Sequence, residues 1–219
     1  MILEVRQTAS SLKQAFDIYY NGGKIYQGAS GSVSRFENIE LSQKGKRFFH
    51  GKYQAPNWKT HIPLLPLFHY NKKTRIFQLY SNDENVGVLY HSHHGFMKRC
   101  HVIELLNGDK IYAYTYSKGK VEYVSFYLNE KQIAQMEVFI GRVVSNMYTY
   151  TIYLLDGFAK YHQVFCLFAL HYASYHHAER LEINQGKTTS TSAYTISPYN
   201  DKFDPNWKAL HFQQEELTK

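Results

Sequence analysis

The chain of 219 residues is predicted to form one domain, or two at most, and its 44% of hydrophobic residues suffices for a sizeable core. Its formal charge of +7 favours an anionic partner such as a membrane surface or nucleic acid, but the basic residues are spread along the chain, which equally fits an ordinary soluble basic protein. Nucleic acid is the weaker candidate, because most tyrosines alternate in strands as packing residues do. The sequence predicts no secretory signal and no transmembrane segment. Cys100 and Cys166 are too few for a disulfide framework, so we expect a reduced, cytoplasmic protein.

Up to residue 155 the chain is predicted to consist of short strands joined by turns. Asn21-Gly22-Gly23 and Asn107-Gly108 are typical of tight hairpins, because Asn and Gly tolerate positive φ angles. In the strand Lys110–Tyr116, tyrosines alternate with Ile, Ala and Thr, which predicts two chemically different faces. The candidate strands are Leu3–Gln7, Phe16–Tyr20, Lys24–Gly28, Val33–Leu41, Arg47–Tyr53, Leu64–Tyr70, Arg75–Tyr80, Val86–His91, Val102–Leu106, Lys110–Tyr116, Val121–Leu128, Ile133–Ile140 and Met147–Leu155.

The long segment that follows, Phe158–Arg180, is predicted to be a helix, and residues 164–170 within it have no polar break. A helix that is apolar on every side has to be enclosed, and this one is too short for a membrane span of about 20 apolar residues. A barrel of about twelve strands is too wide to be filled by its own side chains alone. We therefore predict a mainly β fold, a closed antiparallel barrel of about twelve strands over residues 1–197 that encloses the hydrophobic C-terminal helix, with residues 198–219 as a tail or short helix.

Two segments resemble the tubby C-terminal-like superfamily, which includes the LURP-one-related proteins and the phospholipid scramblases. Phe16–Tyr26 is similar to the opening hairpin of LURP-one-related proteins, and Tyr150–Asp156 is similar to the strand that leads into the central helix of the family. Val138–Asn146 is similar to the lipid-contacting strand of tubby, with Arg142 at the first basic position and Val144 at the second. The resemblance implies a barrel around a helix and a binding role for phosphoinositide head groups.

Basic residues gather near several predicted turns, where an anionic ligand would be bound if two of the groups met on one side of the barrel. Solvated loop charge is the alternative interpretation of the same residues. The candidates are Lys44, Lys46 and Arg47, then Lys72, Lys73 and Arg75, then Lys98 and Arg99, together with Arg142.

Histidines are numerous, at 12, and His91-Ser92-His93-His94 is their densest group. On a strand, His91 and His93 point to the same side and can share a metal ion, with His101 or Asp83 as the source of a third ligand. The alternative is a polar surface at the end of a strand. Histidines 171, 176 and 177 lack the spacing of a helical metal pair and are expected at the mouth of the barrel.

The sequence contains no Gly-x-Ser-x-Gly elbow, no phosphate-binding loop and no Gly-x-Gly-x-x-Gly motif. Cys166 lies in the apolar helix, where a thiol is expected to be inert packing. We therefore predict a binding protein that is not an enzyme and needs no cofactor, with an anionic phospholipid head group or a protein as its partner. The alternative is a metal-binding protein or an enzyme that uses the strand carrying His91, His93 and His94.

Overall fold

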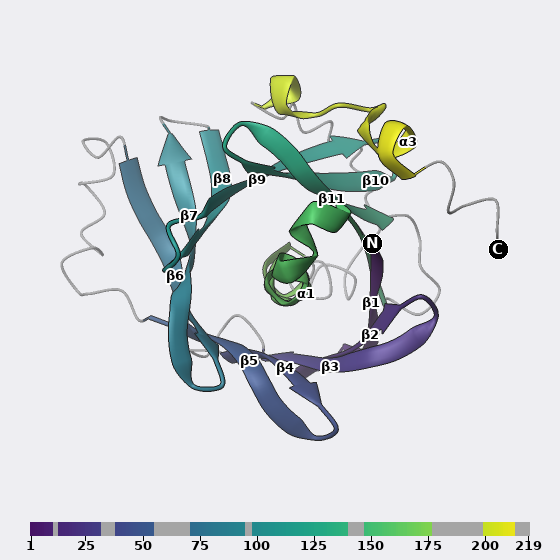
Figure 1. The fold of residues 1–219 in the computed structure, drawn as a ribbon. Helices are drawn as coiled ribbons and strands as arrows, with labels where there is room; N and C mark the ends of the chain where they lie inside the picture. Colours follow the sequence, from purple (N-terminus) through teal and green to yellow (C-terminus); the bar gives the residue numbers. More distant parts are fainter. Residues whose placement is uncertain are drawn as a thin grey trace, which may run out of the picture.

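Twelve antiparallel strands close into a barrel around a helix, which confirms the predicted fold class (Figure 1). The computed structural model describes residues 1–10, 13–31, 38–54, 71–94, 98–139, 147–176 and 199–212. Every strand pairs with its neighbours in sequence, and β1 pairs with β12 to close the ring. The elements are β1 Ile2–Ser10, β2 Lys13–Tyr20, β3 Gly23–Gly31, β4 Asn38–Gln43, β5 Lys46–Tyr53, β6 Asn71–Ser81, β7 Glu84–His94, β8 Lys98–Leu105, β9 Lys110–Lys118, β10 Val121–Leu128, β11 Lys131–Phe139, β12 Thr149–Leu154, η2 Asp156–Tyr161, α1 His162–His176, η3 Asn200–Lys202 and α3 Trp207–Phe212.

The predicted boundaries need a few corrections. The strand expected from Val33 is described from Asn38 on, because residues 32–37 lie outside the described residues, and the strand expected from Arg75 begins at Asn71. Lys98 and Arg99, expected at or near a turn, are the first two residues of β8. The predicted strand Leu64–Tyr70 lies outside the described residues. The expected two-residue turn at Asn107-Gly108 is a four-residue connection instead, because β8 ends at Leu105 and β9 begins at Lys110.

Because consecutive strands are antiparallel, the connections alternate between the two ends of the barrel. At one end, tight turns join β2 to β3, β4 to β5, β6 to β7 and β10 to β11, and we call this the hairpin end. Asn21 and Gly22, with φ angles of 49° and 74°, show why these turns favour Asn and Gly. The four-residue connection between β8 and β9 and the N-terminus lie at the hairpin end too, where the amino group of Met1 is 2.9 Å from Oδ1 of Asp156.

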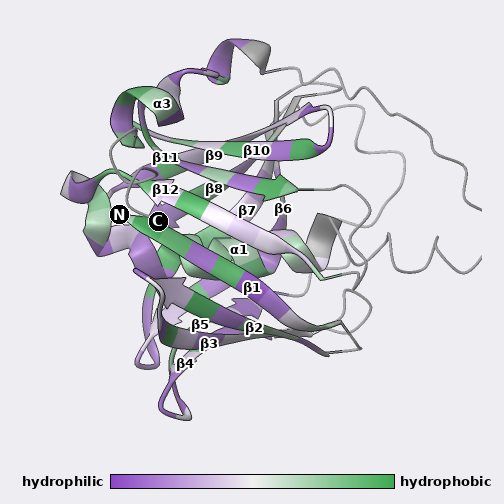
Figure 2. Cartoon of the chain, turned by 90° about the vertical axis from the view of Figure 1, so that its right-hand side faces the viewer, coloured by the Kyte–Doolittle hydropathy of each residue, from purple (hydrophilic) through white to green (hydrophobic). Residues whose placement is uncertain are grey.

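The chain enters the barrel from the hairpin end, because β12 leads into η2 and η2 into α1. Figure 1 shows α1 at the centre of the ring, and Figure 2 shows it lying behind β1, inside the barrel. Residues 164–170 are all buried, as their apolar run predicted, and the burial continues to residue 174. Gly28 of β3 lets the helix come close, since a Cβ atom there would lie 2.6 Å from Cδ2 of Leu170. No helix among the described residues is long and apolar enough to cross a membrane.

The alternation predicted for β9 separates the inside of the barrel from the outside. Ile111 and Ala113 are 0% exposed in the interior, whereas Tyr112 and Tyr114, which alternate with them, face outward. The segment 199–212 packs on this outer side, with Phe203 stacked on Tyr116 at 4.2 Å between ring centroids and Trp207 buried beside Tyr153. The C-terminal segment therefore includes a short helix, α3, whose aromatic residues cover part of the outer wall.

Candidate metal centre

Three histidine side chains from three different elements meet inside the barrel. His91 lies on β7, His101 on β8 and His171 on α1, and their exposed fractions are only 5%, 5% and 2%. One ring nitrogen of each lies within 4.8 Å of the other two. The Nε2 atoms of His91 and His171 are 3.3 Å apart. The three imidazoles therefore converge on one point, between the wall of the barrel and the helix.

The pairing register of β7 and β8 produces the first half of this cluster. His91 is directly opposite His101, and side chains at directly opposed positions lie on the same face of a sheet. Leu89 and Ile103, which form the next inward pair, belong to the interior core, so His91 and His101 face inward too. Their ring centroids are 4.2 Å apart. The strand pairing alone thus positions two of the three imidazoles.

The helix supplies the third imidazole. His171 follows Phe168 by three residues, so both lie on one face of α1. Phe168 lies edge-on to His101 at 5.2 Å between ring centroids, and His171 is 5.5 Å from His91 and 5.6 Å from His101 by the same measure. The rotation of α1 that buries Phe168 against the wall therefore also brings His171 to the two strand histidines.

Aromatic rings surround the three histidines and separate them from water. Phe77 of β6 is 4.9 Å from His171, and Tyr172 is 6.1 Å from His101, both measured between ring centroids. The hydroxyl of Tyr172 donates a hydrogen bond to Oε2 of Glu122 at 3.1 Å, and both side chains are buried. Burial raises the pKa of Tyr172 well above its ordinary value, and the negative charge of the Glu122 carboxylate adds to this effect. Tyr172 therefore stays a neutral hydrogen-bond donor.

The spacing between two of the three ring nitrogens fits a tetrahedral metal ion. Zn²⁺ binds histidine nitrogen at about 2.0–2.1 Å, which places two ligand nitrogens of a tetrahedron about 3.3–3.4 Å apart. The 3.3 Å between His91 and His171 matches that edge. The same distance suits a direct hydrogen bond in which one imidazole donates and the other accepts. The two arrangements differ in whether an ion is bound.

Sequence reasoning named part of this cluster and missed part of it. The structure brings His91 together with His101, one of the two sources considered for a third ligand. Asp83, the other source, lies at the hairpin end, where its Oδ1 is 3.0 Å from Nη2 of Arg47. The side chains of His93 and His94 lie outside the described ones. The expectation that His171 lies at the mouth of the barrel is wrong, because the helix carries this residue deep into the interior.

Two of the basic groups considered for an anionic ligand lie on backbone segments at opposite ends of the barrel. Lys44, Lys46 and Arg47 are exposed at the turn between β4 and β5, at the hairpin end. Lys98 and Arg99 begin β8, which starts at the opposite end of the barrel and runs toward the hairpin end. The β4–β5 and β8 groups are therefore separated by the length of the barrel. Arg142 lies outside the described residues.

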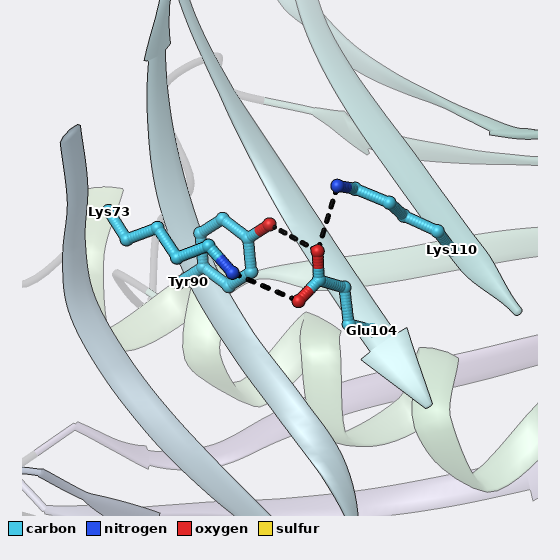
Figure 3. A network of polar contacts seen from close by, with 4 residues as sticks. All are labelled: Lys73, Tyr90, Glu104 and Lys110. Atoms are coloured by element: carbon cyan, nitrogen blue, oxygen red, sulfur yellow. Dashed lines mark hydrogen bonds and ion pairs between the residues drawn. The ribbon is translucent and has the colours of Figure 1, made fainter. Parts of the chain in front are cut away.

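Lys73, from the remaining basic group, belongs to a polar network on the outside of the barrel (Figure 3). Glu104 accepts hydrogen bonds from Lys73 at 3.0 Å, from Tyr90 at 2.7 Å and from Lys110 at 2.8 Å. The ammonium of Lys73 also lies 4.3 Å from the centroid of the Tyr90 ring. The four residues come from β6, β7, β8 and β9 in turn. The network joins four neighbouring strands around one carboxylate, which is a structural role.

Comparison of the chain with models of protein families, with curated proteins and with solved structures finds no match.

Proposed function

We propose that the protein binds a divalent transition-metal ion of the zinc class through His91, His101 and His171. The observation that carries this proposal is the convergence of one ring nitrogen from each residue within 4.8 Å, in a buried position. Three imidazoles from separate elements meet here, and tertiary structure alone creates the cluster. A metal ion would accept an electron pair from one ring nitrogen of each histidine.

The ligand set selects the class of metal. Imidazole nitrogen suits Zn²⁺, Cu²⁺, Ni²⁺ and Fe²⁺, whereas Mg²⁺ and Ca²⁺ prefer oxygen ligands. Burial raises the pKa of the Cys166 thiol to about 12, so this residue stays protonated and is a poor ligand. Cys100 belongs to a cluster on the outer face and does not point toward the three histidines. Among the described residues, the ligands of the proposed site are therefore all histidine nitrogens.

The position of the site implies a mechanical consequence. His91 and His101 belong to the wall of the barrel, while His171 belongs to the enclosed helix. An ion bound by all three would link the wall to the helix across segments that are far apart in the sequence. Because the three ligands are brought together only by folding, binding of the ion adds to the stability of the folded state.

Titration of the metal-free protein with Co²⁺ tests this function, because the visible spectrum of Co²⁺ distinguishes tetrahedral nitrogen coordination from the hydrated ion. We expect saturation at one ion per chain and displacement by Zn²⁺. His101→Gln removes one ligand, and we expect it to weaken Co²⁺ binding by at least tenfold. His50→Gln is the matched control, because His50 is also mostly buried but stacks on Tyr80, away from the cluster.

The alternative arrangement makes the opposite prediction. If His91 and His171 share only a hydrogen bond, wild-type protein will show the spectrum of hydrated Co²⁺, and elemental analysis will find no stoichiometric zinc, copper, nickel or iron. The proposal also fails if His101→Gln and His50→Gln bind Co²⁺ as well as the wild type does, since the ion would then lie elsewhere on the chain.

Membership of the tubby-like superfamily and binding to an anionic membrane surface remain predictions. The exposed Lys44, Lys46 and Arg47 at the hairpin end are the local feature that supports a surface interaction. Flotation with liposomes that contain anionic lipid, compared with neutral liposomes and repeated at high salt, tests it. No binding to anionic liposomes at low salt would rule the membrane interaction out.

A further inference from the structure

The hairpin end of the barrel contains a hollow of about 370 Å³. It lies where the chain enters the barrel, between the beginning of α1 on one side and strands β5 to β8 on the other. Its volume falls within the range of about 300–1,000 Å³ that small-molecule sites occupy. The hollow is independent of the metal proposal, because the three histidines lie farther along α1, toward the opposite end of the barrel.

The wall of the hollow is mainly apolar. Phe49 and Val164 line it from the buried core, with exposed fractions of 4% and 8%, and Val86 and Leu105 are partly buried beside them. Leu106 stands at the rim and is 74% exposed. An exposed leucine next to an apolar hollow extends the surface that an apolar ligand covers. These side chains favour a ligand with a hydrocarbon part.

One cationic side chain borders this apolar wall. Lys160 of η2 lines the hollow, and its side chain is 65% exposed. Oδ2 of Asp109 is 4.0 Å from its ammonium and already accepts a hydrogen bond from the hydroxyl of Tyr161. At that distance the pairing with Asp109 is weak, since exposed ion pairs contribute little. The ammonium also interacts with Tyr161, whose ring centroid lies 4.8 Å away, but an ammonium has three donors and so retains capacity for an anionic group at the rim.

We propose that this hollow binds a small amphiphilic anion with a single hydrocarbon part, such as a medium-chain carboxylate. The hydrocarbon part lies against Phe49, Val86 and Val164, and the anionic group lies at the rim beside Lys160. The size of the hollow suits one short chain or one or two rings and is too small for a lipid with two long chains. We expect decanoate to bind more tightly than decanol, because only the carboxylate of decanoate forms an ion pair with Lys160.

Fluorescence of 1-anilinonaphthalene-8-sulfonate, a rigid apolar anion, provides the assay, with decanoate and decanol as competitors. We expect saturable binding of one probe per folded chain and displacement by decanoate. Lys160→Met should weaken displacement by decanoate at least fivefold and leave decanol unchanged. Lys131→Met is the matched control, because Lys131 is an exposed lysine of the β10–β11 hairpin at the same end of the barrel and does not line the hollow.

A second variant tests the apolar part of the site. Val86→Trp places a large side chain from the partly buried rim into the hollow, and we expect it to abolish binding of the probe and of both competitors. Circular dichroism and the unfolding midpoint establish that each variant is folded. The proposal is overturned if folded wild-type protein shows no saturable probe binding, if Lys160→Met and Lys131→Met weaken decanoate equally, or if folded Val86→Trp binds as the wild type does.

Discussion

The first and second halves of the enclosed helix meet the barrel wall through different chemistry. In the first half, Phe126 of the wall packs edge-on against Phe165 and Phe168, at 4.7 and 4.9 Å between ring centroids. In the second half, His171 meets two histidines of the wall and Tyr172 bonds to a buried carboxylate. The first half contributes non-directional burial, which tolerates small shifts. The second half needs every polar atom in place, so it fixes the rotation of the helix.

The largest effect is expected from a charge in the apolar half. Leu167→Asp places a carboxylate at a position that is 1% exposed, and the cost of an uncompensated buried charge approaches the whole stability of a typical domain, about 5–15 kcal/mol. We expect the variant to be unfolded at 25 °C by circular dichroism. Leu210→Asp is the control, because Leu210 is 72% exposed and its change should have little effect. A folded, soluble Leu167→Asp variant would contradict enclosure of the helix.

The second effect distinguishes the two halves by their response to metal. At a Zn²⁺ concentration of 100 times Kd, wild-type protein should gain about 2.7 kcal/mol of unfolding free energy. Phe126→Leu should lower stability in the absence of metal but keep this gain, because it changes only the apolar half. His101→Gln should lose the gain. Urea unfolding with and without Zn²⁺ measures the gain. If Phe126→Leu and His101→Gln gain the same unfolding free energy from Zn²⁺, the two halves do not differ in their response to metal.

These halves were not equally predictable from the sequence. Burial of residues 164–170 follows from their composition, because a run without polar residues has to be enclosed whatever the register of its partners. The alternation of Ile111 and Ala113 with tyrosines likewise predicted that β9 has two different faces, and the structure buries the face with Ile111 and Ala113. Both patterns are local, and the barrel followed from counting such patterns.

The metal centre depends on information that no local pattern contains. His91 and His101 meet only because β7 and β8 pair in one register, and a shift by one residue would move one of them to the outside. His171 joins them only because of the rotation and depth of α1 inside the barrel. The spacing of the histidines along the chain therefore indicated His91 and His93 on one strand, with His101 or Asp83 as a third ligand, and gave no indication of His171.

A third prediction concerns the buried carboxylate of the polar half. Tyr172→Phe removes the hydroxyl that donates to Glu122, and loss of a hydrogen bond to a buried charged group typically costs about 1.5–3 kcal/mol. We expect a decrease of this size in the unfolding free energy, measured with urea. Tyr20→Phe, at a position that is 36% exposed, should change it by less than about 0.5 kcal/mol. Equal effects of the two substitutions would mean that the hydrogen bond between Tyr172 and Glu122 makes no measurable contribution to the unfolding free energy.

The smallest effect is expected from a carboxylate outside the barrel. Burial alone would raise the pKa of Glu104, but hydrogen bonds from Lys110, Tyr90 and Lys73 outweigh it and lower this pKa from 4.5 to about 2. A lowered pKa means that the ionised group stabilises the folded state above the ordinary pKa, and that this contribution disappears as the pH falls from about 4.5 to about 2. Because the side chain is 31% exposed, solvent screening reduces the contribution to about 1 kcal/mol.

Glu104→Gln removes the charge and keeps the shape of the side chain, so it isolates this contribution. We expect it to lower the unfolding free energy by about 1 kcal/mol at pH 7 and by much less near pH 2, where the wild-type carboxylate also becomes protonated. Urea unfolding of both proteins at the two pH values measures the difference, and added salt should reduce it at pH 7. A difference that is the same at both pH values would show that packing, and not the ion pairs with Lys73 and Lys110, accounts for the effect. Glu104 would then stabilise the fold mainly by packing, as the apolar half of the enclosed helix does, and not by polar contacts, as the second half does.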